Sequence, residues 1–332
     1  MNKFLSIASL AALAVAAPLT AQETEQPEFP SPNAIVEAAP ASDWVKIAPS
    51  DLLVMDLAPD TEGNTRRVII QLMSAPPAYG WIGNIRKLAA AKWWDGTSIN
   101  RVQDNYVVQW GDASEEKTLP EGLVQVPESE YVQQFRAIDM EDSKREILAQ
   151  IPELSESQFD DMMRKQMGAD SYAPSNMHMG GWPTAADPTV GERWPIHCYG
   201  AVGVGRGYSP DTGSGAELYT VIGHAPRHLD RNIAVVGRVI EGIEYLSSLP
   251  RGKGQLGFYE DASKRIPITS IRLASELPAA DQLRFEYLDT ESETFAKYAD
   301  ARANRRDPFF IVPAGGADIC NIPLPVRRVV AE

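Results

Sequence analysis

Apolar residues in the first half of the chain form two short runs that are typical of β-strands. These runs, residues 52–57 and 67–72, flank a stretch rich in turn-forming residues. The segment 83–92 carries apolar residues at the spacing of a helix. Residues 100–112 read as two further strand pieces around a turn. The order predicted for this half is therefore strand, strand, helix, strand, strand.

The second half of the chain also carries strand-like runs and a helical stretch. Strand-like runs are expected at residues 199–204, 218–222, 234–239 and 268–273. The stretch 242–249 suggests a short helix between the last two of them. Two series of strands and helices suit a closed antiparallel barrel capped by helices. Periodicity alone does not distinguish that barrel from other α+β or β-barrel folds.

The middle and the end of the chain carry other patterns. Residues 143–150 and 155–167 are expected to be helical, and Ser155 precedes a glutamine by three residues, which is the capping-box pattern. Residues 168–196 are rich in Gly, Pro and aromatic residues and are expected to form an irregular loop. A single helix, at 292–305, is expected in the tail.

The N-terminal segment predicts export. Lys3 supplies a positive charge, residues 4–17 are apolar and small, and Ala21 offers a cleavage point, which is the layout of a signal peptide spanning residues 1–21. The apolar run is shorter than the roughly 20 residues that a spanning helix needs. We therefore expect a periplasmic or secreted protein, with no membrane span after signal removal and a flexible segment at 22–42. An uncleaved N-terminal anchor is the alternative.

Composition narrows the classes of partner. The chain has 332 residues, 44% of them hydrophobic, and a net charge of −14. That charge argues against nucleic acid, which attracts clusters of Lys and Arg. Cys198 and Cys320 are the two cysteines. In an oxidising compartment they are a candidate disulfide, with two buried thiols as the alternative.

Two blocks of motifs occur in a specific order. They cover residues 66–112 and 199–274, and their landmarks are Trp94-Asp95-Gly96-Thr97, Asn100-Arg101-Val102, Gly215-Ala216-Glu217-Leu218-Tyr219, His228-Leu229-Asp230 and Gly237-Arg238-Val239. Together these motifs resemble the cyclophilin family of peptidyl-prolyl cis/trans isomerases.

The resemblance implies a mainly β fold, an eight-stranded closed antiparallel barrel capped by two helices. The cyclophilin-like domain is expected at residues 43–276, with a helical and irregular insertion at about 113–198 and a C-terminal extension at 277–332. The resemblance further implies that the protein is a peptidyl-prolyl cis-trans isomerase that needs no cofactor and no metal. The expected partners are proline-containing segments of unfolded or folding periplasmic proteins, whose X-Pro bonds the enzyme would rotate.

The resemblance also implies the roles of the site residues. Arg101 corresponds to the catalytic arginine, and Gln109 to a glutamine that orients the substrate carbonyl and that arginine. A guanidinium can donate to the prolyl nitrogen only when amide resonance is lost, so it stabilises the transition state more than the ground state. The implied substrate-binding residues are Tyr106, Val107, Gly205, Glu217, Tyr219, His228 and Leu229. Without the resemblance, Arg101 would be read as a surface residue in a salt bridge and the apolar positions as strand core.

Several residues depart from the family pattern. Glu217 replaces a glutamine, Tyr106 and Tyr219 replace phenylalanines, Ile233 replaces a histidine or tyrosine, and Arg206 replaces an asparagine. They leave open a second function, a catalytically weak cyclophilin-fold module that binds peptides as a chaperone. Arg101, Tyr106 and Gln109 favour the isomerase, whereas Arg206, Glu217 and Ile233 favour the module.

Two further motifs suggest other functions. Asp211-Thr212-Gly213-Ser214 matches the aspartic-peptidase tetrapeptide, but that chemistry needs a second carboxylate motif, and no second copy exists. Met177-His178-Met179, with His197 and Cys198, could bind a soft metal, although loop methionines more often pack against a neighbouring surface.

Overall fold

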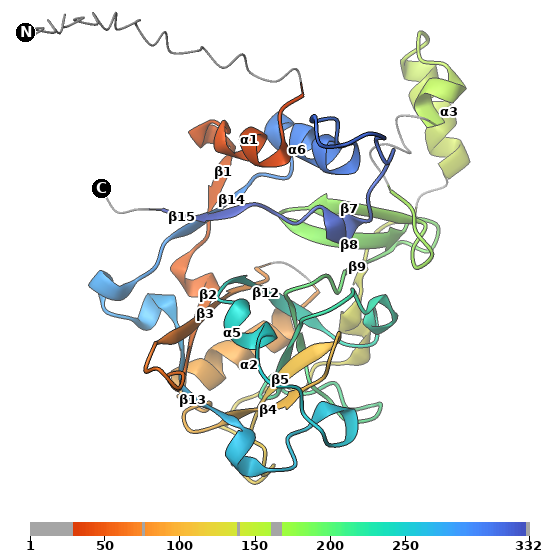
Figure 1. The fold of residues 1–332 in the computed structure, drawn as a ribbon. Coiled ribbons are helices and arrows are strands. Elements are labelled where there is room, and N and C mark those ends of the chain that lie inside the picture. The colour runs from red at the N-terminus through yellow and green to blue at the C-terminus, as the bar shows by residue number, and fades with distance from the viewer. Residues whose placement is uncertain (1–28, 75–76, 138–139, 161–167, 330–332) are drawn as a thin grey trace, which may run out of the picture.

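The computed structural model describes residues 29–74, 77–137, 140–160 and 168–329 (Figure 1). The expected signal peptide and its cleavage point after Ala21 lie outside the described residues. In the part of the chain that is described, no helix has the length and apolar character needed to cross a membrane.

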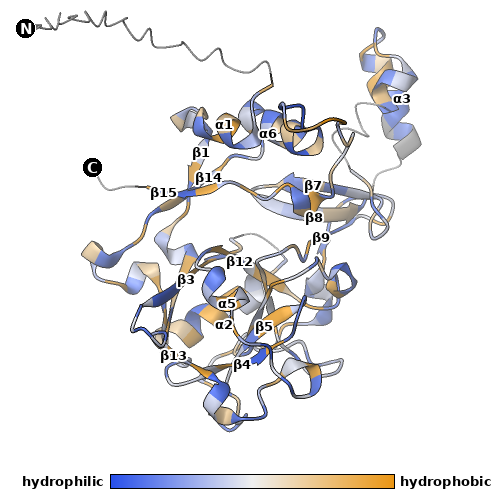
Figure 2. Ribbon diagram, viewed as in Figure 1, coloured by the Kyte–Doolittle hydropathy of each residue, from blue (hydrophilic) through white to orange (hydrophobic). Residues whose placement is uncertain are grey.

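Eight antiparallel strands close into a barrel, in the order β10-β11-β5-β4-β13-β2-β3-β12. Their bounds are β2 Leu52–Leu57, β3 Arg66–Leu72, β4 Ser98–Val102, β5 Val107–Gly111, β10 Ala201–Val204, β11 Leu218–Val221, β12 Val235–Glu241 and β13 Ile266–Leu273. All of these strands overlap stretches expected to be strands, although β4, with the sequence Ser-Ile-Asn-Arg-Val, is not an apolar run, and Figure 2 shows hydrophobic residues in the barrel strands. The expected mainly β fold with an eight-stranded closed barrel is confirmed.

Two helices cap the barrel, α2 (Tyr79–Ala90) and α5 (Glu244–Ser247). Helix α2 begins before the expected 83–92, in a glycine-containing turn that gives little helical signal. Gly80 in that turn lies against Val126, so a Cβ at Gly80 would come 2.7 Å from a methyl group of the valine. The start of the helix is therefore set by packing against a distant loop.

The insertion holds a four-stranded sheet in the order β6-β9-β8-β7 and the helix α3 (Met140–Gln150). The strands are β6 Gln133–Gln134, β7 Ser175–Met179, β8 Trp182–Asp187 and β9 Glu192–Pro195. The prediction of an irregular loop at 168–196 is wrong. These strands are mostly half-buried and lack apolar runs, and Gly180 and Gly181 supply the positive φ angles, 54° and 82°, of the tight β7–β8 turn.

The capping box predicted at Ser155 is present. The Ser155 N–H donates to Gln158 Oε1 at 2.9 Å, and the Gln158 N–H donates to Ser155 Oγ at 3.3 Å. Helical residues follow at 156–160, and the remainder of the expected helix, 161–167, lies outside the described residues.

A third sheet, in the order β1-β14-β15, joins the two ends of the chain. Strand β1 is Trp44–Lys46, β14 is Phe285–Leu288 and β15 is Val326–Arg328. Helices α1 (Pro32–Glu37) and α6 (Glu293–Ala303) lie side by side over this sheet (Figure 1). The tail helix expected at 292–305 is thus present, with Ser292 as its N-cap.

This arrangement departs from the expected flexible segment at 22–42. Within it, α1 forms because Ser31 caps its first turn and Pro32 follows directly, and both are good residues for a helix start. Ile35 and Val36 of α1 then pack on the cluster of Trp44, Leu288, Phe295 and Tyr298. The C-terminal extension is therefore packed against residues from the N-terminal side of the barrel.

The insertion and the extension are joined by a disulfide. Cys198 bonds to Cys320, with an S–S distance of 2.03 Å and a Cα–Cα distance of 5.1 Å. The bond lies beside the apolar cluster of Ala173, Ala185, Trp194, Ile196 and Ile319. The two segments that a minimal barrel lacks are thus held against each other.

Candidate active site

Arg101, on β4, is held by three neutral acceptors. Its Nε donates to the Leu256 carbonyl at 2.7 Å, its Nη1 to Gln109 Oε1 at 3.1 Å, and its Nη2 to Gln103 Oε1. Among the residues that the structure describes, no carboxylate pairs with this guanidinium. The partly buried position lowers the pKa of Arg101. Arg101 is therefore not a surface arginine in a salt bridge with any residue that the structure describes.

Strand register aligns the polar residues of the site. Arg101 on β4 lies opposite Gln109 on β5, after a bulge between Ile99 and Arg101. Gln109 in turn lies opposite Tyr219 on β11. Directly opposite residues share one face of a sheet. The three side chains therefore form one row across three adjacent strands of the barrel.

Aromatic rings flank the guanidinium. The Cζ atom of Arg101 lies 5.8 Å from the centre of the Tyr106 ring and 5.4 Å from that of Phe258. Tyr106 stacks on His228, with ring centres 6.0 Å apart and planes 9° apart. Its hydroxyl lies 3.5 Å from His228 Nε2. Tyr106 is half-buried and His228 is exposed, so this pair forms an edge of the site that is open to solvent.

The floor of the site is apolar and buried. Val107 and Tyr219 are 2% and 5% exposed, and Leu229 packs half-buried against the same core. The expected residues are thus brought together, but Val107 belongs more to the core than to the surface. Ile233 also packs against this core, at the position where cyclophilins have a histidine or tyrosine.

Glu217 is fixed beside Gln109. The Gly205 N–H donates to the Glu217 carbonyl at 2.8 Å. The Glu217 carboxyl group accepts hydrogen bonds from the side chains of Gln109 and Asn100. Burial is the largest influence on this carboxyl group and raises its pKa to about 7. Gly111 makes room for it, because a Cβ there would lie 1.8 Å from a carboxyl oxygen. At neutral pH Glu217 therefore exists in both its neutral and its charged form.

A chain of hydrogen bonds extends from the floor into the insertion, and we call it the buried polar chain. Tyr219 Oη lies 2.9 Å from His197 Nε2, and His197 Nδ1 lies 2.9 Å from Asp230 Oδ1. Arg227 Nε then donates to Asp230 Oδ2, and Arg227 Nη1 to Asp170 Oδ2, each at 2.6 Å. The insertion, through His197 and Asp170, thus supports the floor of the site.

Sequence reasoning missed several of these residues. Phe258 reaches Arg101 through an isolated β-bridge, and His197 and Asp170 come from the insertion. One signal was available: a tyrosine at position 219 needs a partner for its hydroxyl if it is buried. Arg227 is one residue more than the cyclophilin pattern has at this point, and its bonds to Asp230 and Asp170 give it a place in the buried polar chain.

The motifs of the other candidate functions are engaged elsewhere. The Asp211 carboxylate accepts from the N–H groups of Gly207 and Gly213 and so organises its own loop. His197 belongs to the buried polar chain, and Cys198 is in the disulfide. In the described part of the chain, no group of three or more His, Cys, Asp or Glu residues is arranged to hold a metal ion.

Comparison with known proteins agrees with this geometry. Residues 61–273 match the family model described as cyclophilin type peptidyl-prolyl cis-trans isomerase/CLD. No curated protein matches the chain.

One solved structure shows the same fold, and a second matches a smaller share of this chain. The cyclophilin AquaCyp293 from Hirschia baltica is 19% identical, with a TM-score of 0.58 over 87% of this chain and 94% of that one. A cyclophilin-type isomerase from Cryptosporidium parvum is 13% identical, with a TM-score of 0.36 over 67% of this chain and 96% of that one. With its closed barrel and its match over residues 61–273, the chain belongs to the family of cyclophilin-type peptidyl-prolyl cis-trans isomerases.

Proposed function

We propose that the site around Arg101 isomerises X-Pro bonds of exported proteins and so assists their folding. The observation that carries this proposal is the guanidinium itself, fixed by three neutral acceptors with no carboxylate among its described partners. A guanidinium has five N–H donors, and these bonds use three of them. The remaining donors and the undiminished positive charge are available to a substrate.

The chemistry follows from amide resonance. The X-Pro bond is held planar by a barrier of about 18–20 kcal/mol, and rotation makes the prolyl nitrogen pyramidal with a localised lone pair. Arg101 donates to that lone pair, which exists only near the transition state, so the interaction lowers the barrier. Each 1.4 kcal/mol or so of such stabilisation raises the rate about tenfold.

The neighbouring residues have separate tasks. Gln109 holds Nη1 of Arg101 and so fixes the direction of the guanidinium. Tyr106, Tyr219 and Leu229 supply the apolar contact for the proline ring. His228, stacked on Tyr106 at the edge, limits how far that ring can turn outward. Catalysis therefore depends on a donor held rigidly above an apolar floor.

The proposed clients are proline-containing segments of unfolded or folding periplasmic proteins. Support comes from the signal-like residues 1–21 and from the Cys198–Cys320 bond, because disulfides persist in oxidising compartments. Fractionation of cells that express the full chain tests this point. Recovery of a product that lacks residues 1–21 from the periplasm is expected, and an intact chain in the cytoplasm would contradict export.

The second candidate is a catalytically weak peptide-binding module. The observation in its favour is Glu217, a carboxyl group with a pKa of about 7 where cyclophilins have a neutral glutamine. A module of this kind would bind X-Pro peptides without accelerating their isomerisation. Binding and catalysis therefore have to be measured on the same variants.

Arg101→Ala separates the two functions. As an isomerase, the variant should lose about 10²–10³ in rate and keep most of its affinity for an X-Pro peptide. The matched control is Arg67→Ala, which removes a half-exposed arginine that pairs with Asp56 on the barrel. Wild-type protein that gives no acceleration would favour the binding module. An Arg101→Ala variant as fast as wild type would show that the donor is another residue.

A further inference from the structure

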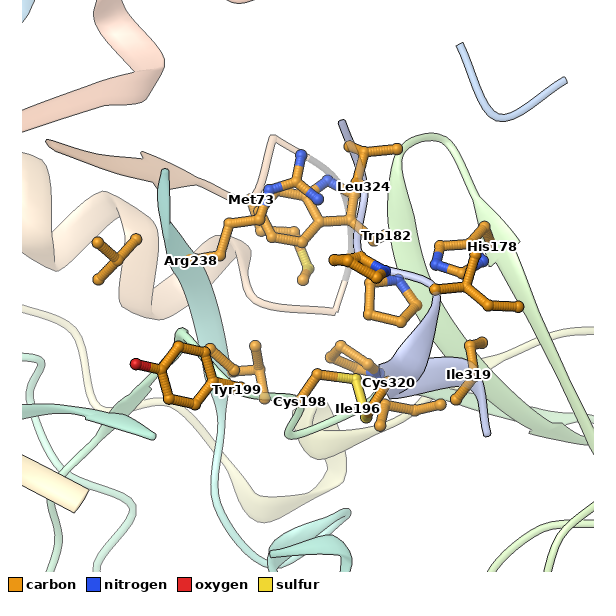
Figure 3. A pocket seen from close by; sticks show the side chains of 18 of the residues that line it. Met73, His178, Trp182, Ile196, Cys198, Tyr199, Arg238, Ile319, Cys320 and Leu324 are labelled. Atoms are coloured by element: carbon orange, nitrogen blue, oxygen red, sulfur yellow. A yellow bond between two sulfur atoms is a disulfide. The ribbon is translucent and has the colours of Figure 1, made fainter. Parts of the chain in front are cut away.

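A cavity of about 260 Å³ lies between the barrel and the two added segments (Figure 3). Its walls are mostly apolar and come from the barrel strand β12, the hairpin β7–β8 and the C-terminal extension. Among the lining residues are Trp182, Ile196, Tyr199, Ile319, Leu324 and the disulfide of Cys198 and Cys320. Tyr199, which also lines the cavity, is 50% exposed.

One charged side chain, Arg238 of β12, is set into this apolar wall. Its guanidinium lies over Trp182, with Cζ 4.2 Å from the ring centre, and 6.0 Å from the ring of Tyr287. Nε and Nη2 donate to Gln71 Oε1 at 3.0 and 2.6 Å, and Nη1 donates to the Gly181 carbonyl. Three of the five N–H donors are thus used, and two are left.

The charge of Arg238 has no counterion among the residues that the structure describes. Burial lowers its pKa to about 9, so the group is still charged at neutral pH. His178, which also lines the cavity, adds no charge, because burial, helped by the charge of Arg238, lowers its pKa to about 4. The described lining residues include no carboxylate and no lysine. The cavity therefore contains one uncompensated positive charge.

A buried charge without a partner is costly, and an anion that enters with it offsets that cost. Apolar walls disfavour a strongly hydrated ion such as phosphate, because it would lose its water without replacement. They favour an anion with an apolar body, whose chain gains by leaving water. Planar carboxylates match the geometry of a guanidinium fork, which suits the two unused donors.

We propose that this cavity binds a small monocarboxylate with a short alkyl chain, its carboxylate on Arg238 and its chain against Trp182 and Leu324. The volume of the cavity limits the length of the alkyl chain. At roughly 30 Å³ for each water-sized group, the space holds about nine such groups. Hexanoate, with about that many non-hydrogen atoms, is therefore the probe of choice.

The test is calorimetric titration of the full chain with hexanoate. Acetate provides the charge without the chain, and hexanol provides the chain without the charge. Hexanoate is expected to bind at least tenfold more tightly than either of them. Equal affinity for hexanol and hexanoate would overturn the proposal, as would the absence of hexanoate binding.

Arg238→Met tests the contact itself, because it keeps the length of an apolar stem and removes the charge. The variant should bind hexanoate at least tenfold more weakly, with isomerase activity unchanged. Arg67→Met, a barrel arginine that does not line the cavity, should bind as wild type does. Unchanged binding in Arg238→Met would overturn the proposal.

A second variant keeps the test decisive if Arg238→Met does not fold. Leu324→Phe fills the cavity from the extension and leaves Arg238 in place. It should also lose hexanoate binding, while its thermal unfolding temperature stays within a few degrees of wild type. Retained binding in a folded Leu324→Phe protein would place the ligand elsewhere and overturn the proposal.

Discussion

The hydroxyl of Tyr219 lies 2.9 Å from Nε2 of His197, and the two rings stack with only 7° between their planes. Both side chains are buried, at 5% and 0% exposed. A buried hydroxyl without a partner is costly, so tyrosine at this position requires a residue such as His197. Because His197 belongs to the insertion, the insertion and the floor of the site depend on each other.

Removal of the hydroxyl should therefore destabilise the protein although the aromatic ring remains. Tyr219→Phe leaves Nε2 of His197 without a partner, which costs about 1–3 kcal/mol. The free energy of unfolding in urea measures this loss. Tyr298→Phe, which removes a buried hydroxyl bonded to the Pro323 carbonyl far from the site, is the matched comparison for the loss of a buried tyrosine hydroxyl.

A double-mutant cycle shows whether the two residues act as a pair. Tyr219→Phe and His197→Gln, alone and together, should give an interaction free energy of at least about 0.5 kcal/mol. Additive effects would mean that the hydrogen bond contributes nothing to stability.

Glu217 should make the stability of the protein depend on pH between about pH 4.5 and 7. Its pKa is about 7 in the folded protein and near 4.5 in the unfolded chain. Below pH 4.5 both states hold the proton and there is no penalty. Between pH 4.5 and 7 the unfolded chain ionises while most of the folded protein keeps its proton, so stability is lost over this range, by about 2–3 kcal/mol between pH 5 and pH 8.

Urea unfolding at pH 5 and pH 8 measures this loss, and Glu217→Gln is the comparison because it cannot ionise. The decrease in stability between the two pH values should be smaller in Glu217→Gln than in wild type by that amount. Identical decreases in the two proteins would show that Glu217 is ionised without a penalty.

Phe258 should contribute to catalysis through Arg101. Its ring lies 5.4 Å from the guanidinium carbon, and a cation–π contact at such a site is worth about 0.5–1 kcal/mol. Phe258→Ala should therefore lower the rate of isomerisation about two- to fivefold. In an Arg101→Ala background the same substitution should have no further effect. An equal loss in both backgrounds would place the role of Phe258 in substrate binding instead.

The Cys198–Cys320 bond should form in the exported protein. Thiol titration of the unfolded, unreduced chain is expected to find no reactive thiol. Reduction should lower the free energy of unfolding by about 2–4 kcal/mol, because the bond closes a loop across a sequence separation of 122 residues. Two reactive thiols in the unreduced protein would contradict the bond.

The sequence predicts those parts of the molecule whose determinants are local. Strands β2 and β3 are apolar runs, so they can be recognised without their partners. Arg101 and Gln109 lie on the two strands of one hairpin, so their positions in the sequence are enough to show that they are neighbours. The same holds for the capping box at Ser155.

Other parts depend on contacts between distant residues, and the sequence does not mark them. Strand β1 is three residues long, and Trp44 becomes a strand residue because Leu288 lies opposite it. Strands β7 to β9 are half-buried, so their apolar residues do not form a pattern that identifies a strand from the sequence. The buried polar chain joins Asp170 to Tyr219 through three residues, and only the fold brings them together.

The sheet β1-β14-β15 has a consequence for synthesis on the ribosome. Strand β1 pairs with β14, whose residues lie about 240 positions later in the chain. At roughly 5–20 residues per second, tens of seconds separate the emergence of the two strands. The first strand made is therefore among the last to find its partner. A nascent chain that stops before residue 285 would leave Trp44 with no strand to cover it.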